Sequence, residues 1–369
     1  MKAIRSAASI AVCLLITACG RGEYVEAIPE VDSLTLEVTG DPSEGAAEMA
    51  RLADGLASTS HALTTPSEYL THARDGVRLV NSTVRELMGR VKEIAETHEG
   101  ERIDATTRRY GPKDVGNVTY RLFIRKLTAT GYGWRLDAKP LGAEDSAYLR
   151  VLGGAVRQAE DTRGRRGAFG ANLDNLQVVD PSFPGQGVLI AGFGVREGNK
   201  TLAYRLQGFT PDAQAHAPVT AAFIGHRRAD TGATSIRLAH QRNLEAIPEG
   251  TEAQELLRVR ARWVPGVGGR GAALATGGDV PEGEAYVGVA CWNAELENGY
   301  SLLSHCTGVG TETRACTPVQ ESGARANCRQ EVRELDEPAL DPLDGALDDD
   351  APDTDVTAPE TEPTGEIDG

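Results

Sequence analysis

Three arginines spaced two residues apart are the clearest candidates for binding chemistry in this sequence. Arg258, Arg260 and Arg262 alternate with apolar residues, and every second side chain of a β-strand projects from the same face. Three guanidinium groups on one face, with Arg227 and Arg228 near them, can bind an anionic head group through charge-assisted hydrogen bonds. The alternative is a solvated sheet face, where these arginines pair with acids on neighbouring strands.

Patterns typical of enzymes and metal sites do not occur in the sequence. It contains no G-x-S-x-G or H-E-x-x-H motif. Ser304-His305-Cys306 is not a catalytic arrangement, because adjacent residues of a strand point to opposite faces. A metal site formed by His226, His240 and His305 is an alternative that no ligand spacing supports. The sequence therefore predicts no enzyme, no cofactor and no metal, and a hydrolase without a recognisable motif remains a third hypothesis.

Four cysteines lie close together near the end of the chain. They are Cys291, Cys306, Cys316 and Cys328, and an even number in an exported chain predicts two disulfides. The spacing leaves three pairings open, of which we favour Cys291–Cys316 with Cys306–Cys328. A zinc site would need closely spaced pairs such as C-x-x-C, which the sequence lacks.

The N-terminus has the pattern of an export signal. Lys2 and Arg5 precede an apolar run over 7–18, which is too short to span a bilayer and ends in small residues. Ile16-Thr17-Ala18-Cys19 resembles the lipobox of bacterial lipoproteins. The resemblance implies that residues 1–18 are removed and that Cys19 is acylated, which attaches the chain to a membrane. Gly20 gives no reason for retention in the inner membrane, so we expect the outer membrane. The alternative is an ordinary secretory signal with an incidental cysteine.

The negative charge of the chain is concentrated in its tail. The formal net charge is −16 over 369 residues, and residues 331–369 hold fifteen Asp and Glu residues and one Arg. Residues 19–330 carry 35 basic and 39 acidic residues. This body has no basic surplus that would indicate nucleic-acid binding. The tail is rich in Pro, Asp, Glu and Thr without aromatic residues, so we expect 331–369 to be disordered.

The apolar pattern predicts an α+β fold that is mainly β. Residues 19–42 are predicted to be a tether, and 43–100 a helical segment whose long helix starts at a capping box, Thr65–Glu68, and buries an apolar seam. Over 110–330 the period changes to two, which predicts about twelve strands in a disulfide-bonded domain. No helix long enough for a crossover intervenes, so we expect an antiparallel meander, a curved sheet or a barrel, with the long helix covering its core face.

The body from Tyr110 to Cys316 also resembles uncharacterised predicted outer-membrane lipoproteins of deltaproteobacterial type. The features that carry the resemblance are Tyr110-Gly111-Pro112, Phe169–Leu176 followed by Asp180-Pro181, Arg260-Ala261-Arg262-Trp263 and Cys291-Trp292-Asn293. It implies an outer-membrane-associated lipoprotein and no particular activity.

Two hypotheses about function follow from these patterns. The first is a non-catalytic, lipid-anchored envelope protein that binds an unidentified envelope protein or helps to organise the envelope. The alternative is a carrier that holds a lipophilic ligand in the cavity of a curved sheet, an analogy at the level of the fold alone. A core filled by Trp134, Trp263 and Trp292 would favour the first hypothesis, and a dry apolar cavity the second.

Overall fold

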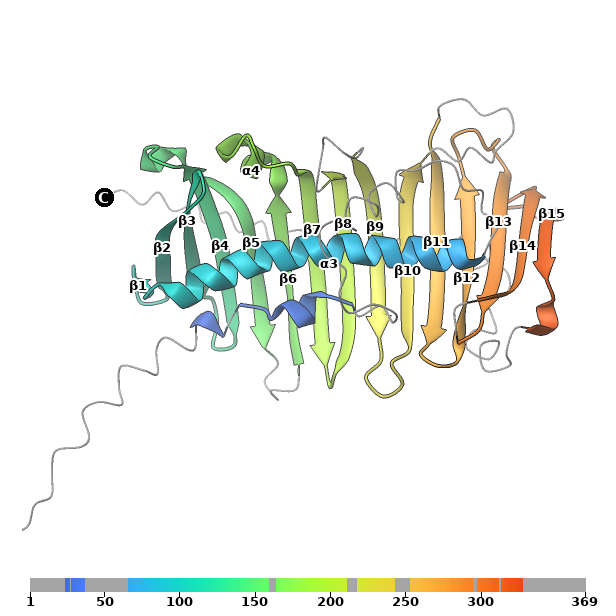
Figure 1. The fold of residues 1–369 in the computed structure, drawn as a ribbon, viewed down its shortest axis with the longest axis horizontal. Coiled ribbons are helices and arrows are strands. Elements are labelled where there is room, and N and C mark those ends of the chain that lie inside the picture. Colours follow the sequence, from blue (N-terminus) through green and yellow to red (C-terminus); the bar gives the residue numbers. More distant parts are fainter. Residues whose placement is uncertain are drawn as a thin grey trace, which may run out of the picture.

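One antiparallel sheet of fifteen strands makes up most of the described part of the chain (Figure 1). The computed structural model describes residues 24–26, 28–36, 66–158, 164–210, 218–242, 253–294, 297–311 and 313–327. Each strand pairs with its neighbours in sequence, and β1 and β15 form two open edges. The strands are β1 (Glu101–Arg102), β2 (Thr107–Val115), β3 (Val118–Lys126), β4 (Gly131–Pro140), β5 (Leu149–Gln158), β6 (Gly164–Asn172), β7 (Gln186–Arg196), β8 (Asn199–Thr210), β9 (Val219–Arg227), β10 (Thr234–Arg242), β11 (Glu255–Val264), β12 (Gly268–Thr276), β13 (Glu284–Trp292), β14 (Asn298–Thr307) and β15 (Ala315–Gly323).

The predicted antiparallel meander is confirmed, but a barrel is wrong because the sheet does not close, and twelve strands are too few. The strands without a sequence signal are β1, β2 and β15. In β2 the pairing with β3 shifts between Tyr110 and Lys113, around the cis peptide bond before Pro112. In β15 every residue is exposed, so no alternation of apolar and polar residues marks it as a strand. Pro318 fits this position, because an edge strand needs no hydrogen-bond donor on its open side.

A short helix interrupts the predicted run of strands over 110–330. β6 ends at Asn172 and the helix α4 (Leu173–Val179) follows. The Asn172 side chain accepts a hydrogen bond from the backbone N–H of Asn175 at 2.9 Å, which caps the helix. Leu173, Leu176 and Val179 are buried, so the apolar positions of this stretch follow a helical period.

A long helix, α3 (Pro66–Thr97), lies across the strands on one face of the sheet, as predicted (Figure 1). It packs against β2 and β3 near its C-terminal end and against β10–β14 elsewhere. Its buried apolar side chains face this sheet surface, which we call the inner face; they include Val77, Val80, Val84, Met88, Val91 and Ile94. Within the described residues, no helix combines the length and the apolar character needed to cross a membrane. The part of the predicted helical segment that precedes residue 66 lies outside the described residues.

The predicted tether, 19–42, is packed against the body in its described parts, so that prediction is wrong for residues 24–36. This N-terminal segment contains the 3-10 helix η1 (Val31–Leu34), and Ile28, Leu34 and Leu36 are at most 4% exposed. Asn81 of α3 holds Leu36 by two hydrogen bonds: its amide nitrogen donates to the Leu36 carbonyl at 2.8 Å, and its amide oxygen accepts from the Leu36 N–H at 3.2 Å. The Tyr204 hydroxyl donates to the Leu34 carbonyl.

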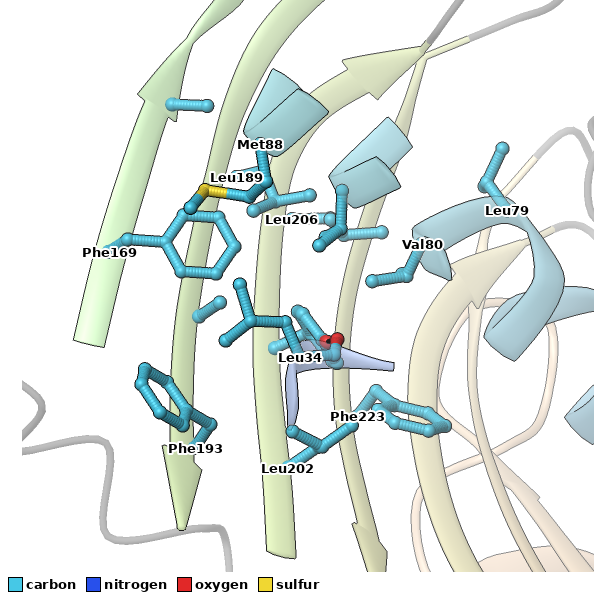
Figure 2. Packing of buried hydrophobic residues seen from close by; sticks show 14 of the residues in the cluster. Leu34, Leu79, Val80, Met88, Phe169, Leu189, Phe193, Leu202, Leu206 and Phe223 are labelled. Carbon is cyan, nitrogen blue, oxygen red and sulfur yellow. Dashed lines mark hydrogen bonds between the residues drawn. The ribbon is translucent and has the colours of Figure 1, made fainter. Parts of the chain in front are cut away.

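The inner face of the sheet, α3 and the N-terminal segment enclose the main core. Figure 2 shows Leu34 between Met88 of α3 and strand residues such as Leu202 and Phe223. Some aromatic rings pack directly against glycines of the neighbouring strand. The Trp292 indole is so close to Gly269 that a Cβ added there would come within 2.5 Å of it. Trp134, Trp263 and Trp292 are all at most 5% exposed, so bulky side chains fill the inner face. Two further 3-10 turns, η2 (Asp145–Ala147) and η3 (Arg325–Asn327), lie at the sheet periphery.

A candidate anion-binding edge

The meander brings every second turn to the same end of the strands. Below, edge means one of these two borders of the sheet, where the turns lie, and not the edge strands β1 and β15. In an antiparallel sheet with sequential pairing, successive turns alternate between the two edges. The turns β1–β2, β3–β4, β5–β6, β7–β8, β9–β10, β11–β12 and β13–β14 therefore share one edge, at the bottom of Figure 1, and the other turns share the opposite edge. Residues far apart in sequence become neighbours along each edge.

The bottom edge is strongly basic. We count the turns and the three strand residues on either side of each, within the described residues. They hold fourteen basic side chains, namely Arg102, Arg108, Arg109, Arg125, Lys126, Arg157, Arg165, Arg166, Arg196, Lys200, Arg227, Arg228, Arg262 and Arg270. The acidic ones are Glu101, Asp104, Glu197, Asp230 and Glu297. We call this edge the basic edge.

The opposite edge has the reverse charge by the same count. Its described acidic residues are Asp114, Glu144, Asp145, Asp174, Asp180, Glu255, Asp279, Glu282 and Glu284, against the basic residues Lys113, Lys139, Arg150, Arg242 and Arg314. We call it the acidic edge. The near-neutral charge of the body therefore conceals two oppositely charged edges, which the sequence analysis missed.

A cavity of about 680 Å³ opens within the basic edge at the ends of β5–β8. Arg157, Arg165, Arg166 and Arg196 line it together with polar residues and glycines, and we call it the four-arginine cavity. Arg165 donates to the Glu26 carbonyl at 3.2 Å. The space beside Gly194 is open, because no atom lies within 4 Å of the position that a Cβ would take.

Two of these arginines face each other directly. Arg157 and Arg166 are opposite in the β5–β6 ladder, and both are exposed. Like charges directly opposite in a ladder destabilise a sheet. Within the described residues, neither guanidinium has a hydrogen bond or an ion pair with an acid to offset this repulsion. An anion bound between them would remove it.

The structure places Arg258, Arg260 and Arg262 together on the outer face, opposite to α3. The residues that alternate with them in β11, which include Leu257, Val259 and Ala261, are buried on the inner face. Arg262 belongs to the basic edge, whereas Arg258 lies toward the acidic edge. The residues directly opposite these arginines in the two ladders are Ser235, Arg237, Ala239, Arg270, Ala272 and Leu274, none of which is acidic. The row therefore runs from the basic edge up the outer face.

The two neighbouring arginines considered with this row lie elsewhere. Arg227 lies opposite Thr234 and Lys200. Its neighbour His226 lies opposite Ser235, which in turn lies opposite Arg262, so His226 and Arg262 share one face of the sheet. Arg227 therefore points to the other face. Arg228 forms an ion pair with Asp230 at 2.6 Å within its own turn. Neither extends the arginine row.

The N-terminal segment runs along the basic edge. The Tyr24 hydroxyl donates to the Thr106 carbonyl in the β1–β2 turn at 3.2 Å, and the Tyr24 ring packs edge-on against Tyr132. Further along, Lys200 donates to the Asp32 carbonyl at 2.6 Å. The chain therefore joins the body at the β2–β4 end of this edge (Figure 1).

Two exposed apolar side chains lie beside this junction. Ile103, in the β1–β2 turn, is 44% exposed, and Leu127, in the β3–β4 turn, is 55% exposed. Both belong to turns of the basic edge, where Arg102, Arg125 and Lys126 flank them.

The histidines named in the metal hypothesis are not brought together. His226 lies on the outer face, where its Nδ1 is 3.1 Å from the Thr201 hydroxyl; burial, and then the charge of Arg237, lower its pKa. His240 is buried on β10, and His305 on β14 is 2.6 Å from Glu284. In the part of the chain that the structure describes, no three His, Cys, Asp or Glu residues are grouped as metal ligands.

The predicted disulfide pairing is wrong. Cys306 and Cys316 form a disulfide, with their Cα atoms 4.0 Å apart. They are directly opposite in the β14–β15 ladder, a pairing that the sequence could not reveal because β15 has no apolar alternation. Cys291 is also disulfide-bonded. Cys19, Cys328 and the acidic tail 331–369 lie outside the described residues.

Comparison with known proteins gives no relative from which a function can be transferred. No protein-family model matches the chain, and neither a curated protein nor a solved structure matches it. The interpretation of this fold therefore depends on its own geometry.

Proposed function

We propose that this chain is a non-catalytic, lipid-anchored protein of the bacterial cell envelope, held at the outer membrane through Cys19, whose body binds an envelope partner. The observation that carries the proposal is the junction at Tyr24. The lipobox-like Cys19 lies five residues before Tyr24, which is fixed to the β1–β2 turn and to Tyr132. The chain after the anchor therefore leads directly into a packed segment, as expected for a body held at a membrane surface.

The filled inner face supports a binding role over the carrier hypothesis. A lipophilic ligand would need the space that Leu34, Met88 and Phe209 occupy, all of which are at most 1% exposed. Four arginines are among the residues that line the four-arginine cavity, and their guanidinium groups suit an anion better than an acyl chain. Native mass spectrometry of gently purified protein tests the carrier hypothesis, because a carrier would retain a bound lipid beyond its own anchor.

Cell fractionation of the wild type beside Cys19→Ala tests the anchor. We expect the wild type in the outer-membrane fraction, with an intact mass that includes acyl chains and lacks residues 1–18. The Cys19→Ala variant should be released from the membrane with unchanged folding. A mature wild-type product that is freely soluble and still carries its first eighteen residues would refute the proposal.

A further inference from the structure

The length of chain before Tyr24 limits how the body can lie on a membrane. Tyr24 lies five positions after Cys19, and five fully extended residue steps span about 18 Å at most. Because Tyr24 is fixed to the β1–β2 turn, an acyl anchor on Cys19 would hold this end of the basic edge within that distance of the bilayer. The acidic edge lies at the far ends of strands that are nine or ten residues, or about 30 Å, long. The anchor therefore brings the basic edge, and not the acidic edge, to the membrane.

The basic edge has the charge that an anionic surface attracts. Its described turns and the strand residues that flank them carry fourteen basic and five acidic side chains. Glu26, Glu30 and Asp32 of the N-terminal segment reduce this surplus, although Glu30 is paired with Lys92 at 3.0 Å. Each cation near an anionic bilayer strengthens binding about fivefold, so the surplus that remains is large enough to orient the body.

The exposed apolar side chains of the edge are in the right place for a bilayer interface. Ile103 and Leu127 lie in turns next to the Tyr24 junction, where the anchor would hold them closest to the lipid. Apolar side chains flanked by cations are typical of segments that insert shallowly among headgroups.

From these observations we propose that the basic edge docks on the anionic surface of the anchoring membrane and that the four-arginine cavity binds the phosphate of a lipid headgroup. Arg157 and Arg166, opposite each other in the ladder, would hold the phosphate oxygens by charge-assisted hydrogen bonds. This inference rests on the proposed anchor at Cys19, which brings the basic edge to the membrane. It adds a second contact with that membrane, between the arginines of the cavity and a lipid phosphate.

The test separates docking from anchoring by using the full mature chain with Cys19→Ser, which cannot be acylated. Its binding is measured by flotation with vesicles of phosphatidylcholine alone or of phosphatidylcholine mixed with phosphatidylglycerol. We expect binding only to the mixed vesicles, and weaker binding as salt is raised. Adding Arg157→Gln and Arg166→Gln should lower the binding constant about 25-fold, at about fivefold for each charge.

A matched control removes the same charge from other places. Arg85 on α3 and Arg150 at the acidic edge are both exposed, and their double Gln variant should bind within about twofold of the parent chain. Near-UV circular dichroism of each variant checks that the fold is kept. The pair Ile103→Ser and Leu127→Ser should weaken the part of the binding that persists at high salt.

Several outcomes would overturn the docking proposal. They are failure of the unacylated chain to bind mixed vesicles, equal losses in the cavity variant and its control, and binding of soluble inorganic polyphosphate without binding of vesicles. The last result would assign the cavity to a soluble polyanion. None of these outcomes bears on the anchor, because release of Cys19→Ala from membranes in cells tests that separately.

Discussion

Replacing Asn81 tests whether the N-terminal segment is an integral part of the body. Its side-chain amide makes hydrogen bonds of 2.8 Å to the carbonyl and 3.2 Å to the N–H of Leu36. Asn81 is 5% exposed and Leu36 is 1% exposed, so water has little access to replace the lost partner. Asn81→Ala leaves a buried donor and a buried acceptor unsatisfied.

The expected cost follows from these two groups. Each buried backbone group without a partner costs about 1–3 kcal/mol, so Asn81→Ala should lower the free energy of unfolding by about 2–6 kcal/mol. Asn81→Asp tests the two hydrogen bonds to Leu36 more specifically than Asn81→Ala does. It retains an acceptor for the Leu36 N–H, but at neutral pH it directs a charged oxygen at the Leu36 carbonyl. Protonation supplies the missing donor, so this variant should regain stability relative to wild type as the pH falls through the raised pKa of the buried carboxyl.

Urea unfolding followed by tryptophan fluorescence measures the global effect, and hydrogen exchange over residues 28–36 measures local release of the segment. Ser82→Ala is the control: its hydroxyl bonds only to the Leu79 carbonyl within the same helix, so a change within about 0.5 kcal/mol is expected. If Asn81→Ala changed neither the unfolding free energy nor the protection of 28–36, the segment would not be held as described, and the distance limit on the membrane would fail with it.

Three further predictions concern the sheet and its turns. Peptide mapping without reduction should recover Cys306 linked to Cys316, and replacing both by Ser should cost about 2–3 kcal/mol because the closed loop is short. Gly269→Ala should destabilise by about 1–3 kcal/mol through a clash with the indole above it, whereas Gly194→Ala, which meets no atom within 4 Å, should be nearly neutral. Backbone hydrogen bonds, first that of Thr106, lower the pKa of Asp104 from 3.8 to about 2. Its stabilising effect should therefore be complete above pH 3.8 and disappear as the pH falls through 2, as carboxyl NMR titration and comparison with Asp104→Asn would show.

Apolar alternation was sufficient to predict most of the sheet. It located the strands from β3 to β14 and the seam of α3, because one face of each element is buried against the core. Apolar alternation is missing from a strand whose two faces are equally exposed. In β15 all nine residues are exposed, and its place is secured by pairing with β14 and by the Cys306–Cys316 disulfide. A sequence pattern cannot report an element that long-range pairing alone creates.

The N-terminal segment shows a different limit. Tyr24, Ile28, Leu34 and Leu36 are spaced irregularly, so no single period marks them, and the acidic residues between them suggested a solvated tether. Each contact is long-range: Asn81 binds Leu36 across 45 residues, and Tyr204 binds Leu34 across 170. Only the folded sheet creates the surface that these residues cover.

The basic edge was, by contrast, within reach of the sequence. Once an antiparallel meander is predicted, odd-numbered and even-numbered turns must fall on opposite edges, and the charges of the turns and of the strand ends that flank them can be sorted accordingly. Summing charge over the whole body hid the pattern, because the acids at one edge cancel the arginines at the other. The row Arg258–Arg262 drew attention to the outer face, although Arg262 alone of its three arginines belongs to the edge.

An acyl anchor and a charged edge restrain different properties of a membrane-bound body. The proposed anchor would limit the distance between Tyr24 and the bilayer but would leave the body free to rotate about that point, because a short chain has no torsional stiffness. A basic edge that extends over seven turns would resist this rotation, since tilting moves cations away from a field that decays within about 10 Å. With the basic edge on lipid as proposed, the acidic edge would face the aqueous space. Its exposed Leu141 and Val178, 52% and 65% exposed, then lie on the surface that an envelope partner would reach first.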